Sequence, residues 1–320
     1  MKKKTRIVLL VVVSLLVVLF VGMSYFVGLQ VFNGSTQLVT NDGTSGVSET
    51  FWTKYGIDYK EFCDKYKIDS IEIVSSFEGH IIPADYIYAK QSEESKDNKT
   101  VVMVHGLGGN RYTNYPVAEM FLDKGYNVLT YDQRSSNENM AQYTAFGYLE
   151  KYDLIDCINY LKEKAPDQII GVWGTSFGGA TAGLALGYED VDLMVDFAIL
   201  DCPVSNMEWM INEEMKNMNI GIPVSYLTWC GNIINKLKLG FSYKDADVGS
   251  ALSKVGTPVL IINSKADTLT PYFMGKDIYE SIQGSNKMIW TVEDSEHTEM
   301  WLDYNQEYRD KVTEFLKDID

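Results

Sequence analysis

Histidine and cysteine are scarce in this sequence, and this limits the chemistry open to it. The 320 residues include three histidines and four cysteines. The cysteines, at positions 63, 157, 202 and 230, are widely spaced and form no C-x-x-C pair. Disulfide frameworks and zinc sites need clustered cysteine or histidine, so neither is expected. The sequence therefore predicts no bound metal.

Positive charge is limited as well. The chain has 28 lysines and arginines against 44 acidic residues, which gives a formal net charge of −16. Four cations lie at the N-terminus (Lys2, Lys3, Lys4 and Arg6), and without them the chain carries about −20. A surface of this sign repels phosphate backbones, so nucleic acid is not expected as a partner.

Charge is absent altogether from residues 7–28. As a helix, this stretch would rise about 33 Å, which is enough to cross a bilayer core. A cleaved signal peptide also begins with cations and an apolar run, but the length and the lack of an A-x-A-like site favour an uncleaved anchor. Cations precede the stretch and the next one is Lys54, so we expect a cytoplasmic N-terminus and an extracellular remainder at the cell membrane.

The chain after the apolar stretch begins with a polar segment. Residues 33–46, NGSTQLVTNDGTSG, are rich in glycine and small polar residues, a composition typical of a flexible tether. The rest is long enough for one large domain with an insertion. The expected segments are a cytoplasmic start (1–6), a transmembrane anchor (7–28), a linker (29–48) and one domain (49–320) with an insertion at about 203–250.

Apolar runs and helical patterns alternate through the large domain. Two alternating runs suggest an opening hairpin, and the later runs are short and buried in character. Strands that alternate with helices predict an α/β fold with a mostly parallel sheet covered by helices on both faces. The expected strands are 69–77, 81–90, 100–106, 126–132, 168–174, 193–201, 257–264 and 287–294. The expected helices are 112–124, 147–164, 177–187 and 303–317.

The alternation stops between about 203 and 250. This stretch is rich in methionine and tryptophan and has no strand pattern, which predicts a small helical insertion. An apolar insertion between strands can cap a pocket.

A glycine-flanked serine, Ser176 in GTSFGG, follows an expected strand and precedes an expected helix. This setting is that of a nucleophile held on a sharp strand-to-helix turn. Gly174 and Gly178 would let the two backbones approach closely. A five-residue motif also arises by chance, so the rest of the chain must supply the partners that such a serine needs.

A serine nucleophile needs a histidine base, and the base needs a carboxylate. His80 and His105 come before the serine, whereas His297 follows the last strand. Asp267 and Asp201 both follow strands between Ser176 and His297, which leaves two candidates for the acid. Asp294 lies too close to His297 in sequence and suits a turn better. His105 and an Asp132–Arg134 ion pair are expected to support loops.

The ordered motifs resemble the alpha/beta-hydrolase fold superfamily. They are HGLGGN (105–110), YDQR (131–134), GTSFGG (174–179), ADTLTP (266–271) and SEHTE (295–299). With the N-terminal anchor, they look like bacterial membrane-anchored serine hydrolases of the esterase-like, S33/S9-like group. The resemblance covers about residues 69–318 and implies an eight-stranded sheet.

The resemblance also implies roles for particular residues. Asp267 would be the acid of a triad with Ser176 and His297, and the backbone N–H groups of Leu107 and Phe177 would form the oxyanion hole. It implies a carboxylesterase-like serine hydrolase that works through an acyl-enzyme, with an acyl ester or peptide substrate and no cofactor. The sequence leaves the oligomeric state open.

Two alternatives stay open at this point. One is a cell-surface serine peptidase on the same fold, for which Glu213 and Glu214 could bind a substrate amino group. The other is a hydrolase-like binding module without catalytic activity. The fold does not choose between them, because one scaffold hosts many functions.

Overall fold

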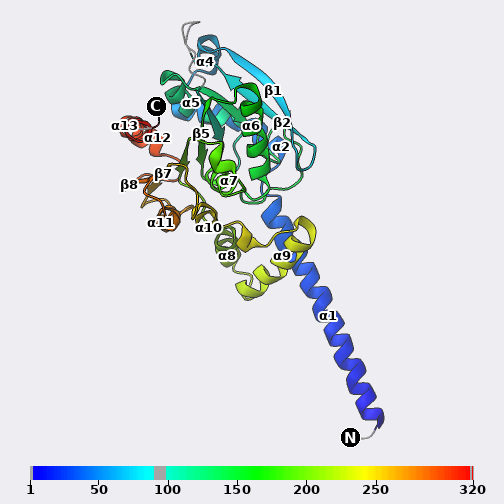
Figure 1. Cartoon of the computed structure of the whole chain (residues 1–320). Helices are drawn as coiled ribbons and strands as arrows, with labels where there is room; N and C mark the ends of the chain where they lie inside the picture. Colours follow the sequence, from blue (N-terminus) through cyan, green and yellow to red (C-terminus); the bar gives the residue numbers. More distant parts are fainter. Residues whose placement is uncertain (1–2, 90–98, 318, 320) are drawn as a thin grey trace. The chain divides into compact units, whose positions relative to one another are not determined.

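Eight strands form one mixed sheet in the computed structural model, which describes residues 3–89, 99–317 and 319 (Figure 1). The strand order is β1-β2-β4-β3-β5-β6-β7-β8. β2 pairs antiparallel with β1 and β4, and all other neighbours are parallel, which confirms the predicted mostly parallel sheet. The strands are β1 (Ile68–Val74), β2 (Ile81–Ile87), β3 (Lys99–Val104), β4 (Asn127–Tyr131), β5 (Ile169–Thr175), β6 (Phe197–Asp201), β7 (Val259–Ser264) and β8 (Lys287–Val292).

The described chain divides into two compact units. The sheet belongs to the unit formed by residues 37–206 and 246–320, and the other unit consists of residues 1–36 and 207–245. The helices of the sheet unit are α2 (Asn41–Ser45), α3 (Val47–Tyr55), α4 (Tyr59–Lys65), α5 (Tyr115–Asp123), α6 (Glu150–Lys164), α7 (Phe177–Leu186), α10 (Val248–Leu252), α11 (Phe273–Ser281), α12 (Met300–Asp303) and α13 (Asn305–Leu316). Those of the other unit are α1 (Lys3–Thr36), α8 (Met207–Met218) and α9 (Val224–Leu239).

The central strands are buried along most of their length, as their continuous apolar runs predict. Gly171 in β5 shows how closely they pack, because a Cβ there would lie 2.0 Å from the Phe197 ring of β6. β6 begins at Phe197, later than the predicted 193, since residues 191–193 form a 3₁₀ turn instead. Parallel strands β5, β7 and β8 end at one edge of the sheet, and this edge positions the loops that follow them.

The polar segment expected to be a flexible tether is folded. α1 continues to Thr36, and α2 begins after Thr40, whose hydroxyl accepts the Gly43 N–H at 3.1 Å. Thr44 is buried, and its carbonyl accepts Asn110 Nδ2 at 2.8 Å. The prediction of a tether was wrong because Thr40 caps α2, and Asn41 and Thr44 pair with neighbouring loops.

Residues 37–66, here called the N-terminal arm, lie on the sheet unit. Gly56, with φ +66°, caps the C-terminus of α3, and Asp58 caps the N-terminus of α4, where its side chain accepts the Glu61 N–H at 3.0 Å. The Trp52 ring stacks on Tyr59 with centroids 4.2 Å apart, and its indole N–H donates to the Tyr112 carbonyl at 3.0 Å. These caps and ring contacts hold the arm in one place.

The other unit contains one helix long and apolar enough to cross a membrane, among the residues that the structure describes. The most apolar part of α1 is fully exposed. Residues 207–245 form two helices, α8 and α9, in agreement with the helical character expected of the insertion. Residues 1–2 of the expected cytoplasmic start lie outside the described chain.

Candidate active site

Ser176 occupies a strained turn between β5 and α7. Its φ is +55° and its ψ is −115°, a conformation that costs free energy in a residue with a Cβ. A Cβ on Gly174 would lie 2.3 Å from the Gly178 carbonyl oxygen, and one on Gly178 would lie 2.1 Å from that of Val104. Only glycine permits these approaches, so the two residues flanking the serine fix the turn that exposes its hydroxyl.

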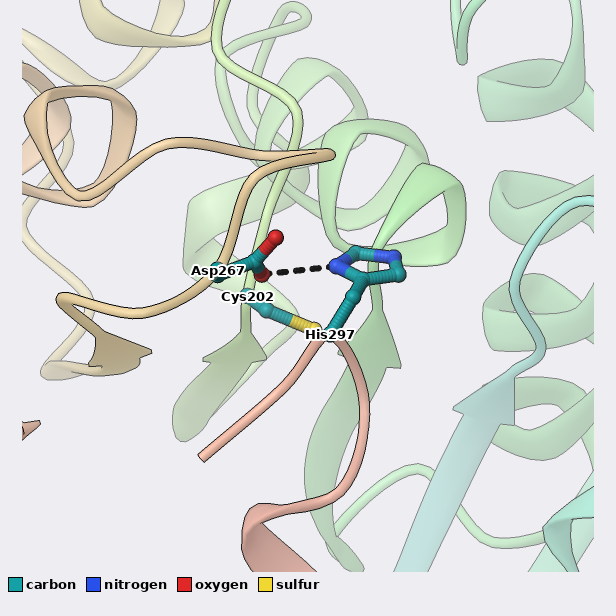
Figure 2. Close-up of side chains that lie close together, drawn as sticks. All are labelled: Cys202, Asp267 and His297. Carbon is teal, nitrogen blue, oxygen red and sulfur yellow. Dashed lines mark hydrogen bonds and ion pairs between the residues drawn. The ribbon is translucent and has the colours of Figure 1, made fainter. Parts of the chain in front are cut away.

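The structure brings Ser176, His297 and Asp267 together. His297 Nε2 lies 2.9 Å from Ser176 Oγ, and His297 Nδ1 lies 2.7 Å from Asp267 Oδ2. Figure 2 shows the imidazole and the carboxylate pointing toward one another, joined by the second of these bonds. The three residues follow β5, β8 and β7, so the edge where these strands end collects them. The imidazole therefore bridges a hydroxyl and a carboxylate through its two nitrogens.

Asp267 is held in its charged form by its neighbours. Burial favours the neutral acid, but the hydrogen bond and charge of His297 and the donors of Thr270 outweigh it and lower the pKa of Asp267. Its Oδ1 accepts the N–H groups of Leu269 and Thr270, each at 2.9 Å, and Thr270 Oγ1 lies 2.8 Å from Oδ2. Thr270 was not predicted, although Asp-x-x-Thr is a recognisable turn pattern.

Asp201, the other candidate for the acid, has a different hydrogen-bond partner. Its Oδ2 accepts the Tyr308 hydroxyl at 2.9 Å, and Tyr308 in turn accepts the Trp173 indole N–H at 2.9 Å. Burial raises the pKa of Asp201 to about 6. The structure thus places Asp267, and not Asp201, at hydrogen-bond distance from His297.

Cys202 lies beside the pair, and with Asp267 and His297 it forms a cluster whose ligand atoms lie within 4.8 Å of one another (Figure 2). Such a cluster has the donor types of a metal site. However, the imidazole and the carboxylate already bind each other, and burial raises the pKa of the Cys202 thiol well above its ordinary value. Because metals bind the thiolate, this set of residues suits a hydrogen-bonded pair better than a metal centre.

The loop after β3 lies next to Ser176. A Cβ on Gly106 would lie 3.4 Å from Ser176 Cβ, and Leu107 lines the same pocket as Ser176. Phe177 is the first residue of α7, so its N–H has no acceptor within the helix. Both residues expected to form the oxyanion hole therefore adjoin Ser176 in space or in sequence.

The other two histidines have structural partners. His105 is buried, its Nδ1 lies 2.7 Å from the Gly106 carbonyl, and its Nε2 accepts the Gln133 N–H at 2.9 Å. His80 Nε2 lies 2.9 Å from Asp153. His105 thus supports its loop, as expected.

The expected Asp132–Arg134 ion pair is wrong. Asp132 pairs with Arg111, whereas Arg134 pairs with Glu78. Arg111 follows the loop after β3, and its long side chain reaches Asp132, which directly follows β4. It therefore takes the place in which Arg134 was expected. Asp294 accepts the Tyr304 hydroxyl and takes no part in the site.

A pocket of about 210 Å³ opens over Ser176 and His297. Most of its wall is aromatic and aliphatic. The polar lining residues besides Ser176 and His297 are Thr113, Asn114, Thr175, Asp201 and Thr298. Two of its residues, Phe51 and Tyr55, come from the N-terminal arm, and no sequence motif indicated them. The apolar lining residues are Phe51, Tyr55, Leu107, Val117, Trp173, Leu269 and Trp301.

The arm also contacts the loop that carries His297. The Tyr55 hydroxyl donates to the Thr298 carbonyl at 3.1 Å, and Lys54 pairs with Glu299. Burial raises the pKa of Tyr55, so its hydroxyl keeps the proton that it donates. Thr298 has φ +63°, which is uncommon for a residue with a branched side chain. The arm therefore braces a strained loop next to the imidazole.

Comparisons with known proteins find similarity to alpha/beta hydrolases. The family described as alpha/beta hydrolase fold matches residues 99–223. The uncharacterized protein YqkD of Bacillus subtilis (strain 168) is 28% identical over 257 residues, which cover 78% of this chain and 83% of YqkD. The lysophosphatidylserine lipase ABHD12 of Danio rerio is 23% identical over 222 residues, which cover 63% of this chain but only 54% of that lipase.

Among solved structures, the esterase Pf2001 of Pyrococcus furiosus is similar, with a TM-score of 0.63 at 23% sequence identity. The match covers 81% of this chain and 93% of the esterase. A likeness at this level of identity shows the fold.

Proposed function

We propose that this chain, which belongs to the alpha/beta-hydrolase superfamily, is a membrane-anchored serine hydrolase that cleaves carboxylic esters. The observation that carries the proposal is the position of His297, within 2.9 Å of Ser176 Oγ and 2.7 Å of Asp267 Oδ2 through opposite ring nitrogens. This is the geometry that lets a serine lose its proton as it attacks.

The proposed reaction has two halves. Ser176 Oγ attacks the ester carbonyl while His297 Nε2 takes its proton, and Asp267 stabilises the imidazolium. The N–H groups of Leu107 and Phe177 stabilise the oxyanion, and His297 then gives its proton to the departing alcohol. Water attacks the acyl-enzyme with His297 again as the base, which releases the acid and restores Ser176.

The pocket supports a compact acyl or aryl group. Its volume of about 210 Å³ is below the 300–1,000 Å³ typical of sites for drug-sized ligands, and most of its wall is apolar. The similarity to a lysophosphatidylserine lipase makes single-chain lipid esters a second class to test. The peptidase alternative rests on Glu213 and Glu214, and Glu213 pairs with Lys216 on its own helix.

We place the protein at the cell membrane with α1 as a single-pass anchor. Lys4 and Arg6 precede the apolar part of α1, whereas the next cation is Lys54, which favours a cytoplasmic N-terminus and an extracellular catalytic unit. Labelling of intact cells by an impermeant reagent at a tag on the C-terminus would test this orientation.

The catalytic proposal is tested with the full-length protein in detergent and a panel of nitrophenyl esters from acetate to palmitate. The panel also includes a lysophospholipid and an aminoacyl anilide. We expect hydrolysis of short-chain esters by the native protein and none above background by Ser176→Ala, with Ser253→Ala, a serine outside the pocket, as the matched control. Cleavage of the anilide alone would contradict the assignment to esters.

A further inference from the structure

The unit formed by residues 1–36 and 207–245 has an apolar surface that the proposed reaction does not use. One side of α9 exposes large apolar residues at helical spacing, and Trp229 is 50% exposed. The turn that joins α8 to α9 exposes more of them. A contiguous exposed patch of this kind marks a contact with a membrane or another protein. The residues are Met218, Ile220, Ile222, Trp229, Ile233 and Leu237.

The charges of α9 lie at its C-terminal end, whereas α8 carries Glu208, Glu213, Glu214 and Lys216 before the turn. Glu208, Glu213 and Lys216 line a pocket together with Trp229. No residue from 217 to 235 is charged, whereas Lys236 and Lys238 follow directly at the C-terminal end of the helix. The turn and the first three turns of α9 are therefore uncharged, with apolar residues and a few amide and hydroxyl side chains, and the far end is cationic. This is the gradient expected of a helix that leaves a bilayer.

α9 packs against the C-terminal half of α1, as Figure 1 shows. Ser24 Oγ lies 2.7 Å from the Tyr226 hydroxyl. A Cβ on Gly28 would lie 2.6 Å from the Cys230 carbonyl oxygen, and one on Gly231 would lie 2.4 Å from Val31. Small residues that bring two backbones together are typical of helix pairs within membranes.

These contacts fix the depth of α9 relative to α1. If the hydrocarbon core begins at Ile7, it ends about 20 residues later, so Ser24 lies roughly 5 Å and Phe20 roughly 10 Å inside its outer boundary. Tyr226 contacts both of them, and the preceding turn with Ile220 lies at the same end of α9. Lys238 stacks over Phe32, which lies roughly 8 Å outside the boundary.

We propose that the turn between α8 and α9 and the first half of α9 insert into the outer leaflet of the lipid bilayer beside α1. The inference rests on α1 being the membrane anchor, and it is independent of the catalytic triad. The apolar end of α9 then lies at the depth where α1 meets hydrocarbon, and its lysines lie at the headgroups. A second insertion point fixes the rotation of α1, which a single helix cannot do alone.

The test uses the full-length protein in phosphatidylcholine vesicles whose acyl chains carry bromine, a short-range quencher of tryptophan fluorescence. α1 contains no tryptophan. We expect brominated lipid to quench the native protein and Trp229→Phe to remove most of that quenching, whereas Trp290→Phe, which changes a tryptophan of strand β8, leaves it unchanged. Replacing both Ile220 and Ile222 by Asp should reduce the quenching at least about twofold, since charge opposes insertion. Leu193→Asp, a matched exposed site in the sheet unit, should not.

The outcomes separate the two claims. Protein that floats with the vesicles but shows no quenching at Trp229 overturns the insertion of α9 and leaves the anchor intact. Disulfide cross-linking between copies of Ile220→Cys, together with an unquenched Trp229, overturns it in favour of a protein partner. Failure of the native protein to float overturns the anchor itself.

Discussion

Two regions of the chain meet at the pocket and contribute different chemistry to it. The loops after β5, β7 and β8 supply the polar groups, Ser176, Asp267 and His297. Hydrogen bonds link the three side chains, and Ser176 lies on a turn with a positive φ. The N-terminal arm supplies Phe51 and Tyr55, which form part of the wall and brace the His297 loop. The proposed reactivity and substrate fit are therefore set by separate parts of the sequence, which can be altered one at a time.

The largest expected effect concerns the two buried acids at the sheet edge. Asp267→Asn should lower kcat for a short-chain ester by about 10⁴-fold, because an amide cannot hold the reactive tautomer of His297. Asp201→Asn should stay within about threefold of the native kcat, since Asp201 bonds to Tyr308 instead. Steady-state kinetics of both variants provide the measurement. Equal losses of kcat in the two variants would mean that both carboxyl groups act in the reaction.

The second effect is on stability and concerns Asp201 again. Its pKa of about 6 in the folded protein lies above its ordinary value of 3.8, so between these values the folded protein binds more protons than the unfolded chain. The free energy of unfolding therefore falls as pH rises through this range, and this carboxyl contributes a loss of about 3 kcal/mol by pH 7.

The comparison of native protein with Asp201→Asn isolates that loss. From pH 4 to pH 7 the melting temperature of the native protein should fall relative to that of the variant. Asp190→Asn, which changes an exposed acid, serves as the control and should follow the native protein. A constant difference between native protein and Asp201→Asn across this range would contradict the raised pKa.

The third effect addresses the arm. Phe51→Ala enlarges the pocket wall without touching the reacting groups, so the ratio of kcat/KM for octanoate to that for acetate should rise about tenfold. Phe77→Ala, which removes an exposed ring outside the pocket, should leave this ratio unchanged. An unchanged ratio in Phe51→Ala would mean that the arm does not contact the acyl group.

The smallest effect concerns the hydrogen bond from Tyr55 in the N-terminal arm to Thr298 in the His297 loop. Tyr55→Phe removes the hydroxyl that donates to Thr298 and should lower kcat about threefold with little change in KM, in line with the modest net value of one neutral hydrogen bond. Tyr304→Phe lacks a hydroxyl that bonds outside the pocket and is the matched control. A change in KM alone would make Tyr55 a substrate contact and not a positioning residue.

The sequence pattern was informative where structure is periodic or where glycine is required. Buried apolar runs predicted the strands, and motif order placed Ser176 and His297 after two of them. The order left Asp201 and Asp267 open as the acid, and the family resemblance favoured Asp267. Gly174 and Gly178 pointed to the tight turn, because few other reasons place two glycines around a serine between a strand and a helix.

The arm and several partners could not be predicted in the same way. The composition of residues 33–46 is that of a flexible chain, and only the caps and the loop contacts of Thr44 explain why it folds. Arg111 pairs with Asp132 across two loops, a contact that depends on side-chain reach and not on spacing. Thr270 acts through hydrogen bonds to Asp267, and Tyr55 acts through one to Thr298. Neither residue leaves a periodic pattern in the sequence.

The most direct test of the account is covalent labelling of the full-length protein with a fluorophosphonate, followed by peptide mass spectrometry. We expect the label on Ser176, and we expect His297→Gln to lower the labelling rate by about 10³-fold or more because the hydroxyl then lacks its base. A label on any other residue, or labelling of His297→Gln at the native rate, would contradict the triad on which the proposed function depends.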